Sequence, residues 1–167
     1  MNTQYTKNDT AAEIVNDLIN IHNDRITGYE LIINRVTDLD SDLKFAFREM
    51  ISKANEYKTQ LAEKKKDMPV RNKNATTLFG TIYRAWLDLK MTFTGNTRKA
   101  VLSYCMYSED IAQHVYNASL NIRVSMNSDI RLLIEKQQEE LEQSYNKVKA
   151  CNEEHHFSLN SRLVYFN

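Results

Sequence analysis

The sequence predicts an all-α protein, a bundle of long amphipathic helices in one domain. Only three glycines and one proline occur among 167 residues, which is too little turn-forming material for a sheet protein of this length. Charged residues make up 26% of the chain, and apolar residues recur at helical spacing in four long stretches. A chain of this length can bury a sizeable core, so we expect one helical domain.

The first predicted helix runs from Thr10 to about Thr37. Thr10 and Glu13 have the spacing of a capping box, in which each side chain accepts a hydrogen bond from the backbone N–H of the other residue. Gly28 lies inside this helix, where glycine costs about 1 kcal/mol relative to alanine, so we expect a neighbouring helix to approach closely there. The apolar stripe of the helix consists of Ile14, Leu18, Ile21, Tyr29, Ile32 and Val36.

The acidic turn at 38–42 predicts the start of a second helix that reaches about Asp67. Its stripe consists of Leu43, Phe47, Met50, Ala54, Tyr57 and Leu61. Three consecutive lysines at 64–66 fall in its last turn, where cations complement the helix dipole. We therefore interpret them as a helix end rather than as a nucleic-acid patch. Pro69 and the polar residues after it predict the longest loop.

Three more helices are predicted in the second half of the chain. A shorter one spans about 77–94 and is followed by Gly95 as a helix stop and Thr97 as the next N-cap. The fourth runs to about Leu120, and the fifth from Ser128 to about His155. Their inward positions are Val101, Tyr104, Cys105, Ile111, Ala112 and Val115, then Ile130, Ile134, Leu141 and Val148.

The long linkage between the second and fourth helices predicts a crossover. Antiparallel neighbours in a bundle need only short loops, whereas residues 68–97 are numerous enough to pass along the bundle. We therefore expect a ferritin-like up-down four-helix bundle with a short crossover helix between bundle helices 2 and 3. The predicted boundaries are a disordered segment at 1–9, the bundle at 10–156, and a tail at 157–167 with enough apolar side chains to dock on it.

Composition argues against several classes of function. Lysine plus arginine equals aspartate plus glutamate at 22 each, so the basic excess that supports nucleic-acid binding is missing. The two cysteines, Cys105 and Cys151, match no zinc motif and are too few for a disulfide framework. The first ten residues lack the apolar run of a secretory signal, and no stretch approaches the length of a membrane span. We expect a cytoplasmic protein that binds neither nucleic acid nor membrane.

Twelve residues within 80–116 form a pattern that resembles a known family. They are Gly80, Arg84, Trp86, Asp88, Lys90, Thr94, Gly95, Leu102, Cys105, Glu109, Asp110 and Tyr116. The pattern resembles DUF2383, a bacterial family of four-helix bundles that is grouped with the ferritin-like proteins, and the similarity covers about residues 10–155. Ser108 stands where that family usually has glycine, and Asn152 where a histidine is common. The resemblance implies the fold and a bacterial origin, but no established activity.

The candidate metal ligands form an incomplete set. Dinuclear sites in such bundles use one Glu from each of two helices and a Glu-x-x-His motif from the other two. Glu30 and Glu109 suit the single-glutamate roles, and Glu140 is the best further carboxylate. The motif itself occurs only at Glu153–His156, near a helix end. We therefore predict no cofactor, with a di-iron or manganese site at these carboxylates as the alternative.

The other inward polar residues favour a structural interpretation. Arg25, Ser108, Glu109, Gln137 and Ser144 are placed to form buried hydrogen bonds or ion pairs that fix helix register. Tyr29, Tyr104 and Tyr116 can satisfy Glu30 or Glu109 through their hydroxyl groups. We interpret His22 as a satisfied, half-buried side chain, His114 as solvent-facing, and Trp86 as an anchor of the crossover helix.

Two classes of function remain open from the sequence. The first is a non-catalytic binding or structural protein, with a link to stress suggested by the resemblance. The second is a metal-dependent oxidoreductase or metal store. The identity of a protein partner does not follow from the sequence, and a homodimer is one candidate because zero net charge neither forbids nor demands self-association.

Overall fold

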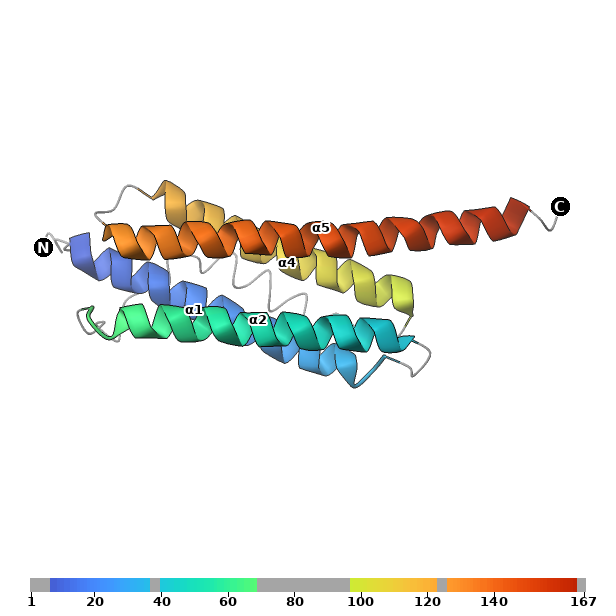
Figure 1. Cartoon of the computed structure of the whole chain (residues 1–167), viewed down its shortest axis with the longest axis horizontal. Coiled ribbons are helices and arrows are strands. Elements are labelled where there is room, and N and C mark those ends of the chain that lie inside the picture. Colours follow the sequence, from blue (N-terminus) through green and yellow to red (C-terminus); the bar gives the residue numbers. More distant parts are fainter. Residues whose placement is uncertain (1–6, 37–39, 69–96, 123–125, 165–167) are drawn as a thin grey trace, which may run out of the picture.

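The structure is a computed structural model that describes residues 7–36, 40–68, 97–122 and 126–164, with side chains described from residue 11 to residue 150. Four helices account for this part of the chain: α1 (Lys7–Ile33), α2 (Ser41–Lys65), α4 (Arg98–Asn121) and α5 (Ser128–Val164). They lie roughly along one axis (Figure 1). The prediction of an all-α four-helix bundle is confirmed.

The helix ends differ from prediction in three places, one of which is the end of α1 at Ile33, four residues before the expected end near Thr37. The α1 helix begins at Lys7, so the expected capping box at Thr10 and Glu13 lies inside the helix and does not start it. The α5 helix continues to Val164, nine residues beyond the expected end, and includes most of the predicted tail. The N-cap at Thr97 is confirmed, since its hydroxyl accepts a hydrogen bond from the backbone N–H of Ala100 at 3.2 Å.

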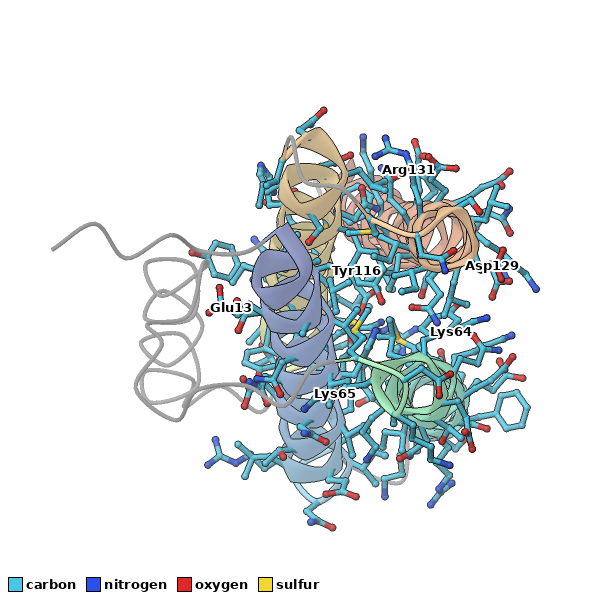
Figure 2. The ribbon with its side chains drawn as sticks, turned by 90° about the vertical axis from the view of Figure 1, so that its left-hand side faces the viewer. Glu13, Lys64, Lys65, Tyr116, Asp129 and Arg131 are labelled. Carbon is cyan, nitrogen blue, oxygen red and sulfur yellow. The ribbon has the colours of Figure 1, made fainter. Side chains whose placement is uncertain are left out.

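The four helices form a ring in which α1 packs on α2 and α4, and α5 packs on α4 and, less closely, on α2. Figure 2 views this ring along the bundle, with α2 and α5 side by side on one flank. Lys64 near the end of α2 lies 4.0 Å from Asp129 at the start of α5. These two helices are therefore antiparallel.

The connection between α2 and α4 joins opposite ends of the bundle. Arg98, the first residue of α4, forms ion pairs with Asp40 at 3.0 Å and Asp42 at 2.6 Å. The starts of α2 and α4 therefore lie together, while α2 ends about 37 Å away along its axis. The chain must return over this length, as the crossover prediction requires. The helix expected at 77–94, with Gly80, Arg84, Trp86, Asp88 and Gly95, lies outside the described residues.

The core consists of two apolar clusters, one toward each end of the bundle. The predicted inward stripes of all four helices are buried, so the periodicity placed the core correctly. Ile14, Leu18, Leu61 and Ile134 are completely buried in one cluster, and Tyr29, Ile32 and Phe47 are almost completely buried in the other. Within the described helices, none has an apolar stretch long enough to cross a membrane.

Gly28 of α1 lies against the side chain of Tyr104 of α4. A Cβ atom at this position would lie 2.5 Å from the hydroxyl oxygen of Tyr104, and the next contacts, to ring carbons of Tyr104, would be 3.5 Å long. Tyr104 is buried, so its ring has little room to move away. The close approach expected from the sequence is confirmed.

We expect Gly28→Ala to destabilise the protein by about 1–3 kcal/mol, the usual cost of overpacking a core, although alanine favours the helix. In a Tyr104→Phe background the clashing oxygen is gone, so the same substitution should be neutral or stabilising by up to about 1 kcal/mol. Urea unfolding of the four proteins in this cycle provides the measurement. An equal effect of Gly28→Ala in both backgrounds would contradict the steric explanation.

The C-terminal part of α5 projects beyond the other helices (Figure 1). The α5 helix has 37 residues, whereas α1, α2 and α4 have 24 to 27. Since each residue adds about 1.5 Å, the excess corresponds to about 15 Å or more of helix. We call residues 151–164 the α5 extension.

Candidate functional site

Six polar side chains meet in the centre of the bundle, and each is at most 2% exposed. The α1 helix supplies three of them at spacings of three and four residues, which places them on one face. Figure 2 shows Tyr116 of α4 pointing into the interior between the helices. We call the group the central cluster; it consists of His22, Arg25, Tyr29, Glu109, Tyr116 and Gln137.

An ion pair between Arg25 and Glu109 forms the middle of the central cluster. The guanidinium donates from Nε at 3.0 Å and from Nη2 at 2.5 Å, both to Oε1 of Glu109. The hydroxyl of Tyr29 donates to the same oxygen. Burial lowers the pKa of Arg25, but the neighbouring carboxylate outweighs it and the pKa is raised above its ordinary value. Arg25 is therefore a permanent buried cation.

His22 connects this ion pair to the other side of the bundle. Its Nδ1 lies 3.2 Å from Nη1 of Arg25 and its Nε2 lies 2.6 Å from the hydroxyl of Tyr116. Because guanidinium groups only donate, Nδ1 must accept and the proton must lie on Nε2. Burial, and then the charge of Arg25, hold the pKa of His22 well below its usual range. The imidazole is therefore neutral.

The hydrogen bonds continue from His22 across to α5 and α2. Tyr116 donates to Oε1 of Gln137 at 2.7 Å. The amide nitrogen of Gln137 donates to Oε1 of Gln60 at 2.9 Å and to the backbone carbonyl of Tyr57 at 3.4 Å. All donors in this path point in the same direction, from Arg25 to α2. The path thus fixes the relative positions of four helices.

The second carboxylate oxygen of Glu109 has no hydrogen-bond partner among the described residues. Oε1 accepts three hydrogen bonds, two from Arg25 and one from Tyr29. The charge of the carboxylate is thus balanced on one side by a guanidinium. Any further group at Glu109 would have to share the site with that cation.

A groove with a volume of about 840 Å³ lies between α2 and α5. Its floor is apolar, with Leu43, Phe47, Met50, Leu141 and Val148 all at most 9% exposed. Charged side chains of both signs form its two edges: Glu49, Lys53 and Glu56 on α2, and Lys136, Glu139, Glu140 and Lys147 on α5. Arg25 of the central cluster also lines it.

Glu140 closes part of this groove. It accepts a hydrogen bond from the hydroxyl of Tyr57 at 2.7 Å and from Lys53 at 3.3 Å. The Tyr57 hydrogen bond, opposed by burial and helped by Lys53, lowers the pKa of Glu140. The hydrogen bonds of Glu140 join α2 to α5 close to Gln137, the last residue of the central cluster.

The three carboxylates predicted as metal candidates are not brought together. Glu30 is exposed, Glu109 is buried against Arg25, and Glu140 is 28% exposed at the groove edge. In the part of the chain with described side chains, no three His, Cys, Asp or Glu residues are grouped so that they could hold a metal ion. The donor set does not fit a dinuclear metal site, because its one buried carboxylate already binds a cation.

The remaining candidates have ordinary packing roles. Cys105 is a buried thiol whose sulfur lies 3.8 Å from Sδ of Met50 and 3.9 Å from the hydroxyl of Tyr29. His114 is exposed next to Asp110, as expected. Ser144 is half-buried on the groove rather than in the centre.

The complete burial of His22 and the groove between α2 and α5 were not predicted from the sequence. His22 was expected to be half-buried but is completely buried. The sequence does contain an indication of this burial, because residues 22, 25 and 29 recur at the same helical spacing as the apolar stripe beside them. The groove depends on how far apart α2 and α5 lie, which the pattern within one helix does not determine.

A sequence model of a family described as a domain of unknown function (DUF2383) matches residues 10–121, which is more than half of the chain. A search of curated proteins and a search of solved structures found no match.

Proposed function

The chain belongs to the DUF2383 family, and on that premise we propose that it is a non-catalytic binding and structural protein. Its connectivity is compatible with the ferritin-like relationship suggested by the resemblance, in which the bundle centre would hold metal. In this chain an internal ion pair takes that position. The bundle is thus a scaffold, and its groove between α2 and α5 is the surface available for binding.

The observation that carries this proposal is the position of the Arg25 guanidinium on Glu109. Metal centres of helical bundles need several carboxylates or imidazoles converging from facing helices. Here the only buried carboxylate of the central cluster accepts two hydrogen bonds from a cation. A metal ion at Glu109 would have to share this carboxylate with the guanidinium or displace it, and displacement would leave an unpaired buried charge that costs several kcal/mol.

The side chains of the central cluster do not favour a catalytic role either. His22 is neutral, and both of its ring nitrogens already have partners. Burial raises the pKa of Tyr29 and of Tyr116 far above the usual range, so neither hydroxyl is suited to act as a base at neutral pH. The groups of this cluster hold one another in place instead of facing a substrate.

Metal analysis tests the proposal. We expect the protein, purified from cells grown with added iron and manganese, to contain far less than one equivalent of either metal. Adding Fe²⁺ or Mn²⁺ should leave its melting temperature unchanged, because an ion that binds the folded state would raise it. Glu109→Gln is the matched control. A stoichiometric metal that is lost in Glu109→Gln would overturn the proposal.

A further inference from the structure

Two features of the fold, a groove and a projecting helix, lie toward the same end of the molecule. One is the groove between α2 and α5, which runs from Tyr57 toward the start of α2 at Leu43. The other is the α5 extension, whose end projects beyond the bundle on that side (Figure 1). A chain cannot place its own straight extension in its own groove, because α5 itself forms one edge of that groove.

We propose that the α5 extension of one copy lies in the α2–α5 groove of a second copy, and that the second copy does the same in return. The two α5 helices would run antiparallel about a two-fold axis near Ala150. Such an isologous contact closes on itself and gives a dimer rather than a fibre. This inference rests on the proposed binding role and names its partner, a second copy of this chain.

The lengths of the two parts agree. The groove is lined on α5 by residues from Lys136 to Val148, a stretch of about four helical turns. The α5 extension, 151–164, has nearly the same length. An axis near Ala150 therefore brings each extension along the whole groove of the other copy.

The sequence register about this axis pairs compatible residues. Residues at equal distances on either side of Ala150 lie at the same level, which places Leu159 level with Leu141 on the apolar floor. The same register places Glu153 level with Lys147. It also places Arg162 level with Gln138, which precedes Glu139 in the sequence. Counted along the sequence, this register places residues of opposite charge near one another at both ends of the paired segment, which favours the antiparallel orientation.

An exposed aromatic ring lies beside the open end of the groove. Phe45 is 64% exposed and lies one turn before Glu49 on α2, so it extends the row of residues at the groove edge. A helix that enters the groove from a second copy would cover it. Reciprocal insertion would occur twice per dimer, and stable interfaces of the usual size bury about 1,200–2,000 Å² in total.

The mass in solution is the first test. We expect light scattering to give twice the monomer mass of 19.6 kDa at micromolar concentrations. Phe45→Ala should raise the dissociation constant by about tenfold, which corresponds to about 1.4 kcal/mol. Leu132→Ala is the matched control, since Leu132 is 63% exposed but lies at the start of α5, at the other end of the bundle. A monomer, or equal effects of the two substitutions, would overturn the proposal.

A charge exchange tests the register. Glu139→Arg and Arg162→Glu should each weaken the dimer several-fold. The double variant should restore the dimer, because the two positions again carry opposite charges, now exchanged. Glu142→Arg is the control, since Glu142 is exposed on α5 and does not line the groove. Two single effects that simply add in the double variant would contradict this register.

Disulfide cross-linking locates the axis. In a Cys151→Ser background, Ala150→Cys should give a covalent dimer under mild oxidation, since the two copies of residue 150 lie at the same level. Asn146→Cys, one turn earlier on an exposed position, should give much less, because its two copies would be separated by about 12 Å along the axis. Equal cross-linking at both positions would exclude the axis. Metal content does not depend on any of these outcomes, so failure here is distinct from failure of the non-catalytic role.

Discussion

Replacing Arg25 by methionine is expected to lower the free energy of unfolding by about 3–5 kcal/mol, the usual cost of breaking a buried ion pair. The substitution leaves Glu109 completely buried without its guanidinium. It also removes the donor to Nδ1 of His22. Domains of this kind have a total stability of about 5–15 kcal/mol, so the loss should be evident in urea unfolding.

Two further variants keep this prediction testable if Arg25→Met folds poorly. The double variant Arg25→Met with Glu109→Leu removes both charges, so it should recover much of the lost stability, as apolar replacements of buried ion pairs often do. Arg131→Met is the matched control, because Arg131 forms an exposed i, i+4 pair with Glu135 worth at most about 0.5 kcal/mol. Equal effects of Arg25→Met and Arg131→Met would contradict the role of the buried pair.

Stability is expected to fall as the pH is lowered below about 6.5, with a slope of up to about 1.4 kcal/mol per pH unit. The pKa of His22 is lowered in the folded protein and is ordinary in the unfolded chain. As the pH falls, the unfolded state therefore binds a proton at His22 before the folded state does. The free energy of unfolding is highest above about pH 6.5 and decreases until the pH reaches the lowered pKa of the folded protein. The positive charges of Arg25 on α1 and Lys58 on α2 disfavour a charged ring, and the hydroxyl of Tyr116 on α4 is a neutral hydrogen-bond partner, so none of these groups stabilises the imidazolium.

The assignment to His22 is checked by comparing two histidine variants. His22→Gln removes the titrating group and should flatten the dependence between about pH 6.5 and 5. His114→Gln is the matched control, because it removes an exposed histidine and leaves the central cluster intact. Asp42 and Glu140, whose pKa values are also lowered, add to the loss only at lower pH. A slope that persists in His22→Gln would contradict the assignment.

Helical periodicity predicted the core well because it depends on each helix alone. The stripe of α2, from Leu43 to Leu61, is buried at every predicted position. The Thr97 cap and the close contact at Gly28 are likewise local features with a direct chemical signature. Charged residues in the core were also predictable, since Arg25 and Glu109 fall at inward positions of their helices.

The features that depend on two helices at once were not predictable in the same way. Either Glu30 or Glu109 could have met a tyrosine hydroxyl, and only the rotation of α1 against α4 decides that Tyr29 binds Glu109. The end of α5 was expected near His155, but polar residues there do not prevent the helix from continuing to Val164. The groove arises from the looser packing of α5 on α2, for which no single helix carries a signal.

The most direct measurement is a crystal structure of the protein grown in Mn²⁺ or Fe²⁺, with anomalous scattering recorded at the bundle centre. We expect no anomalous peak near Glu109, and electron density for the Arg25 guanidinium in contact with Oε1 of that carboxylate. A peak within bonding distance of Glu109, with Arg25 turned away, would contradict the replacement of a metal centre by an ion pair.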